Sequence, residues 1–332
     1  MNIGHDGGFY ETKTVGGDEE RESRILSFAA PPAESLFSLN GHQTVIVESD
    51  EGQFLVGEEA IKKARTGVRK ESRGWIESPE WMSLFYAAMS NLTAATQVSV
   101  NLVTGLPLAD YAQDRETLRA RLQGAHRFTR VGRDSQWVKV VRVRVVPQGW
   151  GPVLALLLDD AGKVVRPELA RQRVAVVDIG GHNVGYLAVD GLSDLPAETR
   201  GTERGAWHVV RVLRDYLEVE HRGLSRLPDH RLMEAVVEGE IWDADRKVDL
   251  TPVVGGILEE VGQEIVDTAR QYWGHDAATF RSVIVCGGGA YLWGERVKRA
   301  FRQAVILERP EMANAVGFYR FAVNQAHSNK SQ

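Results

Sequence analysis

Two segments of the chain repeat one pattern of apolar and polar residues. Each has a short apolar stretch, an aspartate, a glycine pair and a second apolar stretch: "NIGHDGGFYETKTVGG" near the start and "RVAVVDIGGHNVGYLAV" past the middle. Apolar stretches joined through Gly-Gly predict a strand, a turn and a second strand. The two aspartates, Asp6 and Asp178, lie close to half the chain length apart. This spacing predicts two similar halves that face one cleft, each offering a hairpin turn.

Other stretches have helical periodicity. "SPEWMSLFYAAMSNL" has an apolar face and a start signal at Ser78 or Pro79. "DRETLRARLQG" is predicted to open at Asp114, and Gly124 could close it. "VGGILEEVGQEIVDTARQYW" is amphipathic at helical spacing. "GPVLALLLDD" is apolar enough to be a buried helix or a buried strand.

Further strands are predicted between these helices. "QTVIVES" and "QFLVG" are typical of short strands in a small lobe, whereas the stretch from Gly17 to about Asn40 is expected to be rich in loops. "QVSVNLVTGLPL" predicts a buried strand, and "WVKVVRVRVVPQGWG" a half-exposed one, since Arg142 and Arg144 alternate with valines. "SVIVCGGGAYLWGERVKRAF" predicts a strand, a triple glycine and a helix.

Composition narrows the class of protein. A chain of 332 residues with 43% hydrophobic and 26% charged residues is typical of a two-domain globular protein. We see no apolar run long enough to span a membrane and no signal peptide, and the lone Cys286 fits a reducing compartment, so we expect a cytoplasmic protein. A net charge of −5 argues against direct binding of nucleic acid, so any role on DNA would pass through a partner.

The glycine turns suit phosphate chemistry. Glycine lets backbone N–H groups approach phosphate oxygens closely. Asp6 and Asp178 suit Mg²⁺, which takes one or two carboxylates together with water and phosphates, and Lys13 could neutralise phosphate charge. The triple glycine, Gly287 to Gly289, precedes a predicted helix, where a flat adenosine could lie against the backbone.

Each turn also has a simpler interpretation. A strand that ends in Asp-Gly-Gly is usually only a hairpin, and a triple glycine before a helix more often serves tight packing. Common nucleotide motifs are absent from the sequence: Leu292 stands where G-x-G-x-x-G needs its third glycine, and Val164 follows Gly162-Lys163 where a P-loop needs a hydroxyl. It is the occurrence of three such turns in one order that favours a nucleotide site.

That order resembles a known family. "GHDGGFYETK", "VPQGWG", "DIGGHNVGY", "VIVCGGGA" and "PEMANAVGFYRFA" are similar, over about residues 1–322, to the actin-like ATPases of the plasmid-partitioning ParM/StbA group. The resemblance implies an α/β fold of the actin, Hsp70 and sugar-kinase type, with nucleotide in a cleft between duplicated domains. Domain I would span 1–165, with a small subdomain at about 23–74 and with 310–332 packed back on it. Domain II would span 166–309, with a small subdomain at about 204–250.

The resemblance also implies roles for individual residues. Asp6 and Asp178 would bind Mg²⁺ through water, with Asp178 also counted as catalytic, and Lys13 would contact phosphate. Gln148 matches a glutamine or glutamate that orients the attacking water; the alternative is an exposed turn glutamine. The remaining nucleotide contacts would come from Gly7, Gly8, Gly180, Gly181, Asn183, Gly287, Gly288 and Gly289.

The second turn departs from the family pattern. Relatives often follow D-I-G-G with threonines and an aspartate, but this chain has His182, Asn183 and Val184, and Gly185 replaces the acid. Backbone N–H groups supply most of the hold on phosphate, so we expect binding to persist and hydrolysis to be slow. For His182, a solvated loop position is favoured over a phosphate contact.

The leading hypothesis is an ATPase, using ATP or GTP with Mg²⁺, that assembles head to tail into filaments. It would segregate plasmid DNA through a DNA-binding, ParR-like adaptor and would bind neither DNA nor membrane directly. The basic run Lys62–Arg73 is either a solvated face or a contact for a protomer or adaptor. A nucleotide-binding scaffold with weak or no hydrolysis is the alternative. A small-molecule kinase or Hsp70-like chaperone is disfavoured, because no substrate base can be assigned.

Overall fold

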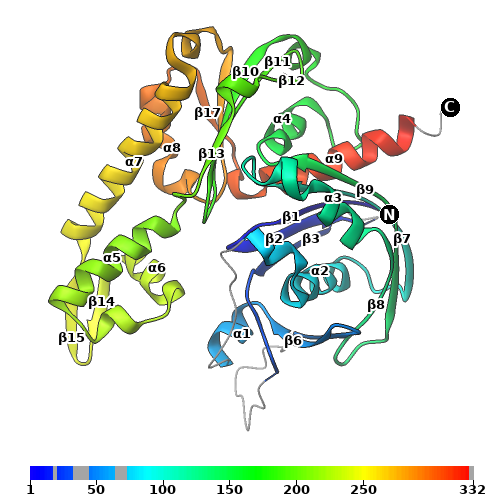
Figure 1. The fold of residues 1–332 in the computed structure, drawn as a ribbon, viewed down its shortest axis with the longest axis horizontal. Helices are drawn as coiled ribbons and strands as arrows, with labels where there is room; N and C mark the ends of the chain where they lie inside the picture. Colours follow the sequence, from blue (N-terminus) through cyan, green and yellow to red (C-terminus); the bar gives the residue numbers. More distant parts are fainter. Residues whose placement is uncertain (18–20, 33–44, 64–72, 329–332) are drawn as a thin grey trace. The chain divides into compact units, whose positions relative to one another are not determined.

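The computed structural model describes residues 1–17, 21–32, 45–63 and 73–328, and the chain divides into two compact units (Figure 1). Unit 1 consists of Met1–Ala170 and Met312–Gln332, and unit 2 of Arg171–Glu311. The chain therefore leaves unit 1, builds unit 2 as one continuous segment, and returns to unit 1 for its last helix.

Unit 1 is built on a mixed sheet in the order β3-β2-β1-β7-β9-β8-β5-β6-β4. Its strands are β1 (Asn2–Gly7), β2 (Glu11–Gly16), β3 (Arg21–Leu26), β4 (Ala29–Ala30), β5 (Ile46–Ser49), β6 (Gly52–Val56), β7 (Gln97–Leu106), β8 (Gly124–Arg130) and β9 (Gln136–Pro147). The sheet curves around helix α2 (Pro79–Leu92), as Figure 1 shows. This helix is buried on nearly all sides because its residues are apolar or small all round. Its first turn is capped by Ser78, whose Oγ accepts from the Trp81 N–H at 3.1 Å.

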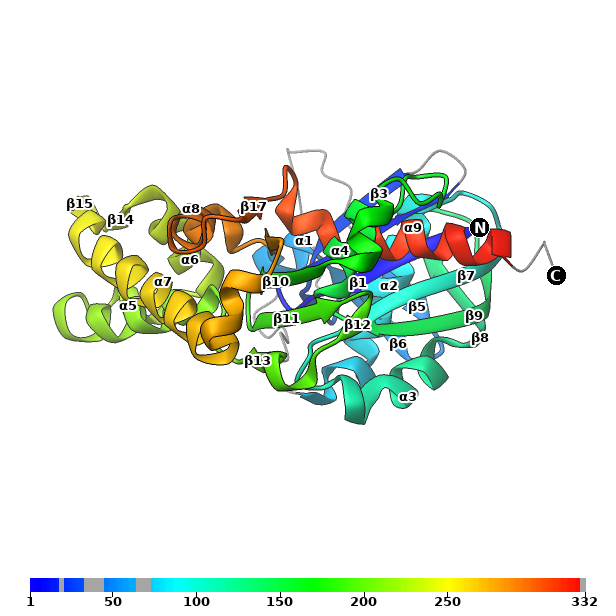
Figure 2. The same ribbon diagram turned by 90° about the horizontal axis from the view of Figure 1, so that it is seen from above.

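The remaining helices of unit 1 are α1 (Glu58–Lys63), α3 (Tyr111–Leu122), α4 (Trp150–Leu157) and α9 (Ala313–Ser328). Helix α9 packs against α4, β1 and β7, and Figure 2 shows α4 and α9 side by side. Glycines make this close approach possible. A Cβ on Gly4 would collide with the α9 backbone at Ala315 and Tyr319, and one on Gly317 would collide with the backbone of Gly151. Helix α9 thus packs with its backbone directly against the backbones of β1 and α4.

Unit 2 has a six-stranded sheet in the order β12-β11-β10-β16-β17, with β13 paired to β11. Its strands are β10 (Arg173–Ile179), β11 (Val184–Asp190), β12 (Ser193–Asp194), β13 (Arg200–Thr202), β16 (Ser282–Cys286) and β17 (Ala304–Ile306), and β14 (Glu240–Asp243) and β15 (Arg246–Asp249) form a separate hairpin. The helices are α5 (Trp207–Glu220), α6 (Asp229–Glu238), α7 (Thr251–Trp273) and α8 (Ala290–Ala300). A continuous apolar core joins the sheet to α5, α7 and α8.

The two units share one strand frame. In unit 1, β1 pairs antiparallel with β2 and parallel with β7; in unit 2, β10 pairs antiparallel with β11 and parallel with β16. Asp6 lies opposite Lys13 in the first hairpin, and Asp178 lies opposite Gly185 in the second. Each hairpin therefore carries its aspartate at the same position of the same frame.

Most of the predicted elements are confirmed, and two predictions were wrong. The helix expected to open at Asp114 begins at Tyr111, and Gly124, with φ 123°, is the first residue of β8 rather than a helix cap. The segment expected to be rich in loops after Gly17 contains β3, which pairs with β2 over its whole length, with Ser23 and Ile25 buried and Arg24 exposed between them. "GPVLALLLDD" is helical in α4. Within the basic run, residues 64–72 lie outside the described residues.

The described helices include none that combines the length and the apolar composition needed to cross a bilayer.

Candidate functional site

The first glycine turn joins β1 to β2 and carries Asp6, which is 5% exposed. The Gln148 Nε2 donates a hydrogen bond to the Asp6 Oδ1 at 2.7 Å. The Lys13 Nζ lies 4.0 Å from the Asp6 Oδ2, across the β1–β2 ladder. Three of the residues named from the sequence therefore meet in one cluster of unit 1, with an acid, an amide and a cation in contact.

Gln148 is held on a short connection between β9 and α4. Its N–H donates to the Leu106 carbonyl at 2.7 Å, which ties it to the end of β7. The next residue, Gly149, has φ 93° and donates its N–H to the Asn314 Oδ1 at 3.2 Å. Asn314 comes from α9 and is 6% exposed, so the Gln148 loop is fixed by a buried side chain from the far end of the chain.

A small cavity of about 30 Å³ borders Gln148 in unit 1. Gly7, Gly8, Trp81 and Asp110 are among its lining residues. The volume is enough for one water molecule beside the amide and the turn.

The carbonyls of the first turn are held by Ser27, which follows β3. The Ser27 hydroxyl donates to the Gly8 carbonyl at 2.6 Å, and the Ser27 N–H donates to the Tyr10 carbonyl at 2.8 Å. In a planar trans peptide the C=O and the following N–H point in opposite directions. The N–H groups of Phe9 and Glu11 are therefore turned away from Ser27.

In the second turn, in unit 2, the carbonyls are likewise held on one side, here by backbone N–H groups. The Gly180 N–H bonds to the Asn183 carbonyl at 2.9 Å and closes the turn. The carbonyls of Gly180, Gly181 and His182 accept from the N–H groups of Ala206, Trp207 and Gly205, at 3.0, 2.8 and 2.8 Å. The backbone at the start of α5 thus donates hydrogen bonds to three carbonyls of the turn. The N–H groups of the turn that follow these carbonyls point to the opposite side. Successive N–H groups turned to one side are the geometry of an anion-binding nest.

The shapes of the two turns agree in a further detail. A Cβ on Gly8 would lie 2.9 Å from the Glu11 carbonyl oxygen, and one on Gly180 would lie 2.9 Å from the Asn183 carbonyl oxygen. Both contacts are closer than real Cβ atoms tolerate, so glycine is required at the same place in each turn.

The third turn lies against the second, within unit 2. Gly287 has φ 81°, and a Cβ there would meet the Asp178 carboxylate and the Ile179 carbonyl. The Gly289 N–H donates to the Ile179 carbonyl at 2.8 Å. Packing accounts for these two glycines, whereas a Cβ on Gly288 would meet no atom within 4 Å among the described residues. A contact between this turn and adenosine stays a prediction.

The sequence of residues 4–151 matches the family model described as "Actin like proteins N terminal domain", and residues 176–299 match "Archaeal actin homologue MreB-like, C-terminal". Together the two matches span most of the chain. The chain is an actin-like protein. No curated protein matches this actin-like protein in sequence.

Solved structures match the actin-like protein over nearly its full length. The archaeal actin homologue Ta0583 is 20% identical and has a TM-score of 0.81, with 98% of this chain and 99% of that chain covered. The structure of Ta0583 in complex with ADP is 19% identical and has a TM-score of 0.79, with 98% and 99% covered. ParM from Clostridium botulinum, in a 15-stranded filament, is 18% identical and has a TM-score of 0.82, with 97% and 98% covered. These likenesses establish the actin-like fold.

Three residues of the actin-like protein join the sites only in the structure: Ser27, Asn314 and Gly205. Ser27 lies in the segment expected to be rich in loops, and Asn314 lies in "PEMANAVGFYRFA", a motif of the family resemblance in which no site residue is predicted. Gly205 closes a stretch with no evident motif, yet a Cβ there would lie 2.5 Å from the Gly181 carbonyl oxygen and 2.6 Å from that of Gly180. Each acts through a contact distant in sequence, which no local pattern reveals.

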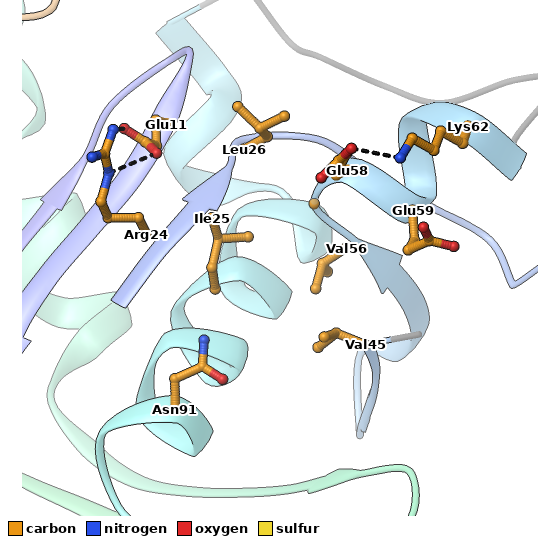
Figure 3. Close-up of a pocket in the computed structure, with 11 residues that line it drawn as sticks. Glu11, Arg24, Ile25, Leu26, Val45, Val56, Glu58, Glu59, Lys62 and Asn91 are labelled. Carbon is orange, nitrogen blue, oxygen red and sulfur yellow. Dashed lines mark hydrogen bonds and ion pairs between the residues drawn. The ribbon is translucent and has the colours of Figure 1, made fainter. Parts of the chain in front are cut away.

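A larger groove of about 390 Å³ is lined by residues of β3, α1 and neighbouring segments (Figure 3). Glu11 and Arg24 form a bidentate ion pair at its rim, with Arg24 Nε and Nη2 at 3.0 and 2.9 Å from the Glu11 carboxylate oxygens. Glu58 and Lys62 form a second pair on α1. The groove is separate from the Asp6 cluster, although Glu11 borders both the groove and the first turn.

Proposed function

We propose that this actin-like protein binds a nucleoside triphosphate through the glycine-pair turns that follow Asp6 and Asp178, and hydrolyses it. The proposal rests above all on the hydrogen bond between Gln148 and Asp6. A neutral amide held against a carboxylate at a phosphate turn can orient a water molecule for attack, since phosphoryl transfer needs mainly placement and charge stabilisation. Lys13 would offset charge that develops on the phosphates.

The phosphates would be held by backbone N–H groups. In each turn the carbonyls are already taken, by Ser27 in unit 1 and by the start of α5 in unit 2, so the N–H groups are oriented before any ligand arrives. Such preorganisation avoids the cost of ordering the turn on binding. Gly7, Gly181 and Asn183 would contribute to this hold, and Gly287 to Gly289 would border the base.

The residues present fit Mg²⁺. Within the described ranges no three His, Cys, Asp or Glu side chains form a group able to hold a metal by themselves. Mg²⁺ instead suits one or two carboxylates completed by water and phosphate oxygens, and Asp6 and Asp178 are the carboxylates at the turns. When bound, the ion would neutralise phosphate charge.

Phosphate release from ATP with Mg²⁺ tests hydrolysis. We expect Gln148→Ala to lower the rate about 100-fold while nucleotide affinity stays nearly constant, because a misplaced water costs the reaction and not the binding. Gln113→Ala, an exposed glutamine on α3, is the matched control and should keep the wild-type rate. A measurable wild-type rate that Gln148→Ala leaves unchanged would remove the proposed role of Gln148.

We further propose that nucleotide drives assembly of the protein into head-to-tail filaments. The support is the full-length likeness to ParM in its filament. A repeated contact between unlike faces that does not close on itself gives an open polymer. Sedimentation with ATP, with ADP and without nucleotide tests this: we expect a pellet that depends on ATP, and monomers at all concentrations with ATP would contradict it.

The finer role that we propose is segregation of plasmid DNA through a DNA-binding adaptor. The net charge of −5 supports the need for an adaptor, since direct DNA binding needs a basic surface. The alternative is a scaffold that binds nucleotide but hydrolyses it weakly. The observation that favours it is Gly185, which occupies in unit 2 the position that Lys13 occupies in unit 1.

A further inference from the structure

Ser27 is the side chain most closely tied to the first turn. It is fully buried, and its hydroxyl and its N–H hold two carbonyls of the turn, those of Gly8 and Tyr10. The same hydroxyl lies 3.0 Å from the Thr12 Oγ1. Ser27 belongs to none of the sequence motifs and has no role in the proposed chemistry.

The donor and acceptor roles follow from the number of protons. A serine hydroxyl carries one proton, and that of Ser27 is given to the Gly8 carbonyl. Thr12 must therefore donate to the Ser27 oxygen. The result is a buried chain of hydrogen bonds, from Thr12 through Ser27 to Gly8, that spans the base of the hairpin.

We propose that Ser27 is a positioning residue for the phosphate-binding face of the first turn. By holding the Gly8 and Tyr10 carbonyls on one side, it fixes the Phe9 and Glu11 N–H groups on the other. Ser27 touches no phosphate itself and acts through the orientation of the peptides. The inference rests on the proposed function, since it assigns those N–H groups to the phosphates of a nucleotide.

Unit 2 supports this assignment independently. There the equivalent carbonyls are held by N–H groups of the α5 start, with no side-chain hydroxyl involved. Two unrelated elements thus hold the carbonyl side of two like turns. A merely local role of Ser27 at the end of β3 would not require this correspondence.

The decisive measurement compares ligands with and without phosphate. Wild type, Ser27→Ala and Ser27→Thr are titrated with ATP and with adenosine, both in the presence of Mg²⁺. We expect Ser27→Ala to weaken ATP binding about tenfold, the equivalent of one hydrogen bond to a charged group, and to leave adenosine affinity unchanged. Ser27→Thr keeps the hydroxyl and should recover most of the ATP affinity.

Ser23→Ala is the matched control. Ser23 is a buried serine on β3 whose hydroxyl accepts from the Asn91 Nδ2, on helix α2, at 3.0 Å. It should lose stability like Ser27→Ala but keep wild-type affinity for ATP. Urea unfolding of each variant separates the two effects.

The outcomes distinguish the inference from the function beneath it. Failure of the wild type to bind ATP would overturn the proposed function and with it this role. A wild type that binds ATP, beside a Ser27→Ala variant that binds equally well, would overturn the role of Ser27 alone. Equal losses for ATP and adenosine, or a Ser23→Ala variant that loses as much, would show that Ser27 is only structural.

Discussion

The two glycine turns share a backbone and differ in the chemistry around it. In unit 1 the aspartate is flanked by two side chains, Lys13 and Gln148, and the carbonyl side is held by a hydroxyl. In unit 2 the aspartate faces Gly185 across the ladder, and the carbonyl side is held by main chain. The two hairpins thus share one strand pairing, and the first carries a cation and an amide beside its aspartate.

The difference shows how two like turns can divide one task. Backbone N–H groups suffice to bind phosphate, and both turns present them. Charge compensation and water orientation need side chains, and among the described residues those side chains surround the first turn. The first turn is therefore expected to govern turnover and salt dependence, and the second turn to govern affinity through shape.

The largest effect on nucleotide affinity is expected when the shape of the second turn is broken. Gly205→Ala places a methyl group 2.5 Å from a turn carbonyl, so the turn or α5 must move. We expect nucleotide affinity to fall by roughly 30-fold and the free energy of unfolding to fall by about 1–3 kcal/mol. Gly223→Ala is the control, since its Cβ would meet nothing within 4 Å and its backbone is helical. Calorimetric titration with ATP that found wild-type affinity for Gly205→Ala would contradict the role of this contact.

A smaller effect is expected when the charge of the first turn is removed. Lys13→Ala should weaken ATP binding about tenfold and flatten its dependence on salt, because one partly buried cation is lost near the phosphates. Lys163→Ala, an exposed lysine of the same unit, should change neither. The reciprocal variant Gly185→Lys sharpens the comparison by placing a cation opposite Asp178, as Lys13 lies opposite Asp6, and stronger salt dependence of ATP binding is expected. Identical salt dependence in wild type and Lys13→Ala would rule out the electrostatic role.

The support of the Gln148 loop gives a third and more selective test. Asn314→Ala leaves the Gly149 N–H without its acceptor, which should lower phosphate release about fivefold and stability by about 1–3 kcal/mol. ATP affinity should hold, because the turn itself is untouched. Asn324→Ala is the control, because Asn324 lies on the same helix as Asn314. Its Nδ2 donates to the Gly162 carbonyl, away from Gln148. A loss of affinity equal to the loss of rate would argue for general unfolding.

The last test concerns pH and a buried histidine that the first hairpin has and the second replaces with valine. His5 lies beneath the first turn, and burial lowers its pKa to about 3 from the ordinary 6.5. The equivalent position in unit 2 is Val177, which is equally buried. Below pH 6.5 the unfolded chain takes up a proton that folded His5 does not accept, so stability falls as pH falls from 6.5 toward 3, by up to roughly 1.4 kcal/mol per pH unit.

His5→Val, which copies unit 2, should remove that part of the acid sensitivity. Urea unfolding at several values between pH 7 and pH 4 measures it. The same slope in wild type and variant would mean that other groups, such as His126, whose pKa burial also lowers, carry the effect.

Local pattern predicted the parts of the fold that local physics determines. The glycine-pair turns after Asp6 and Asp178, the buried helix after Ser78 and the triple glycine before α8 were predictable, because each depends on neighbours in sequence. Strand β3 was missed because its sequence, RESRIL, is mostly polar, and its pairing with β2 decides the conformation.

For the same reason, only part of the candidate site could be predicted from the sequence. Gly7, Gly8, Gly180 and Gly181 were found because a turn is local. Gln148 was named through a family resemblance, and its contact with Asp6 spans most of unit 1. Ser27 lies in no motif, and Asn314 lies in a motif that assigned it no role, since both act through hydrogen bonds to backbone atoms distant in sequence.

The packing of α9 against β1, β7 and α4 has a consequence for the order in which parts of the protein fold. Synthesis runs from the N-terminus, so β1, β7 and α4 leave the ribosome long before residues 313–328 exist. Until then the backbone surfaces at Gly4 and Gly151 are bare, and the Gly149 N–H has no buried acceptor. Unit 2 can complete its own core first, because its segment is continuous. The loop that carries Gln148 therefore gains its buried acceptor only when the last helix docks.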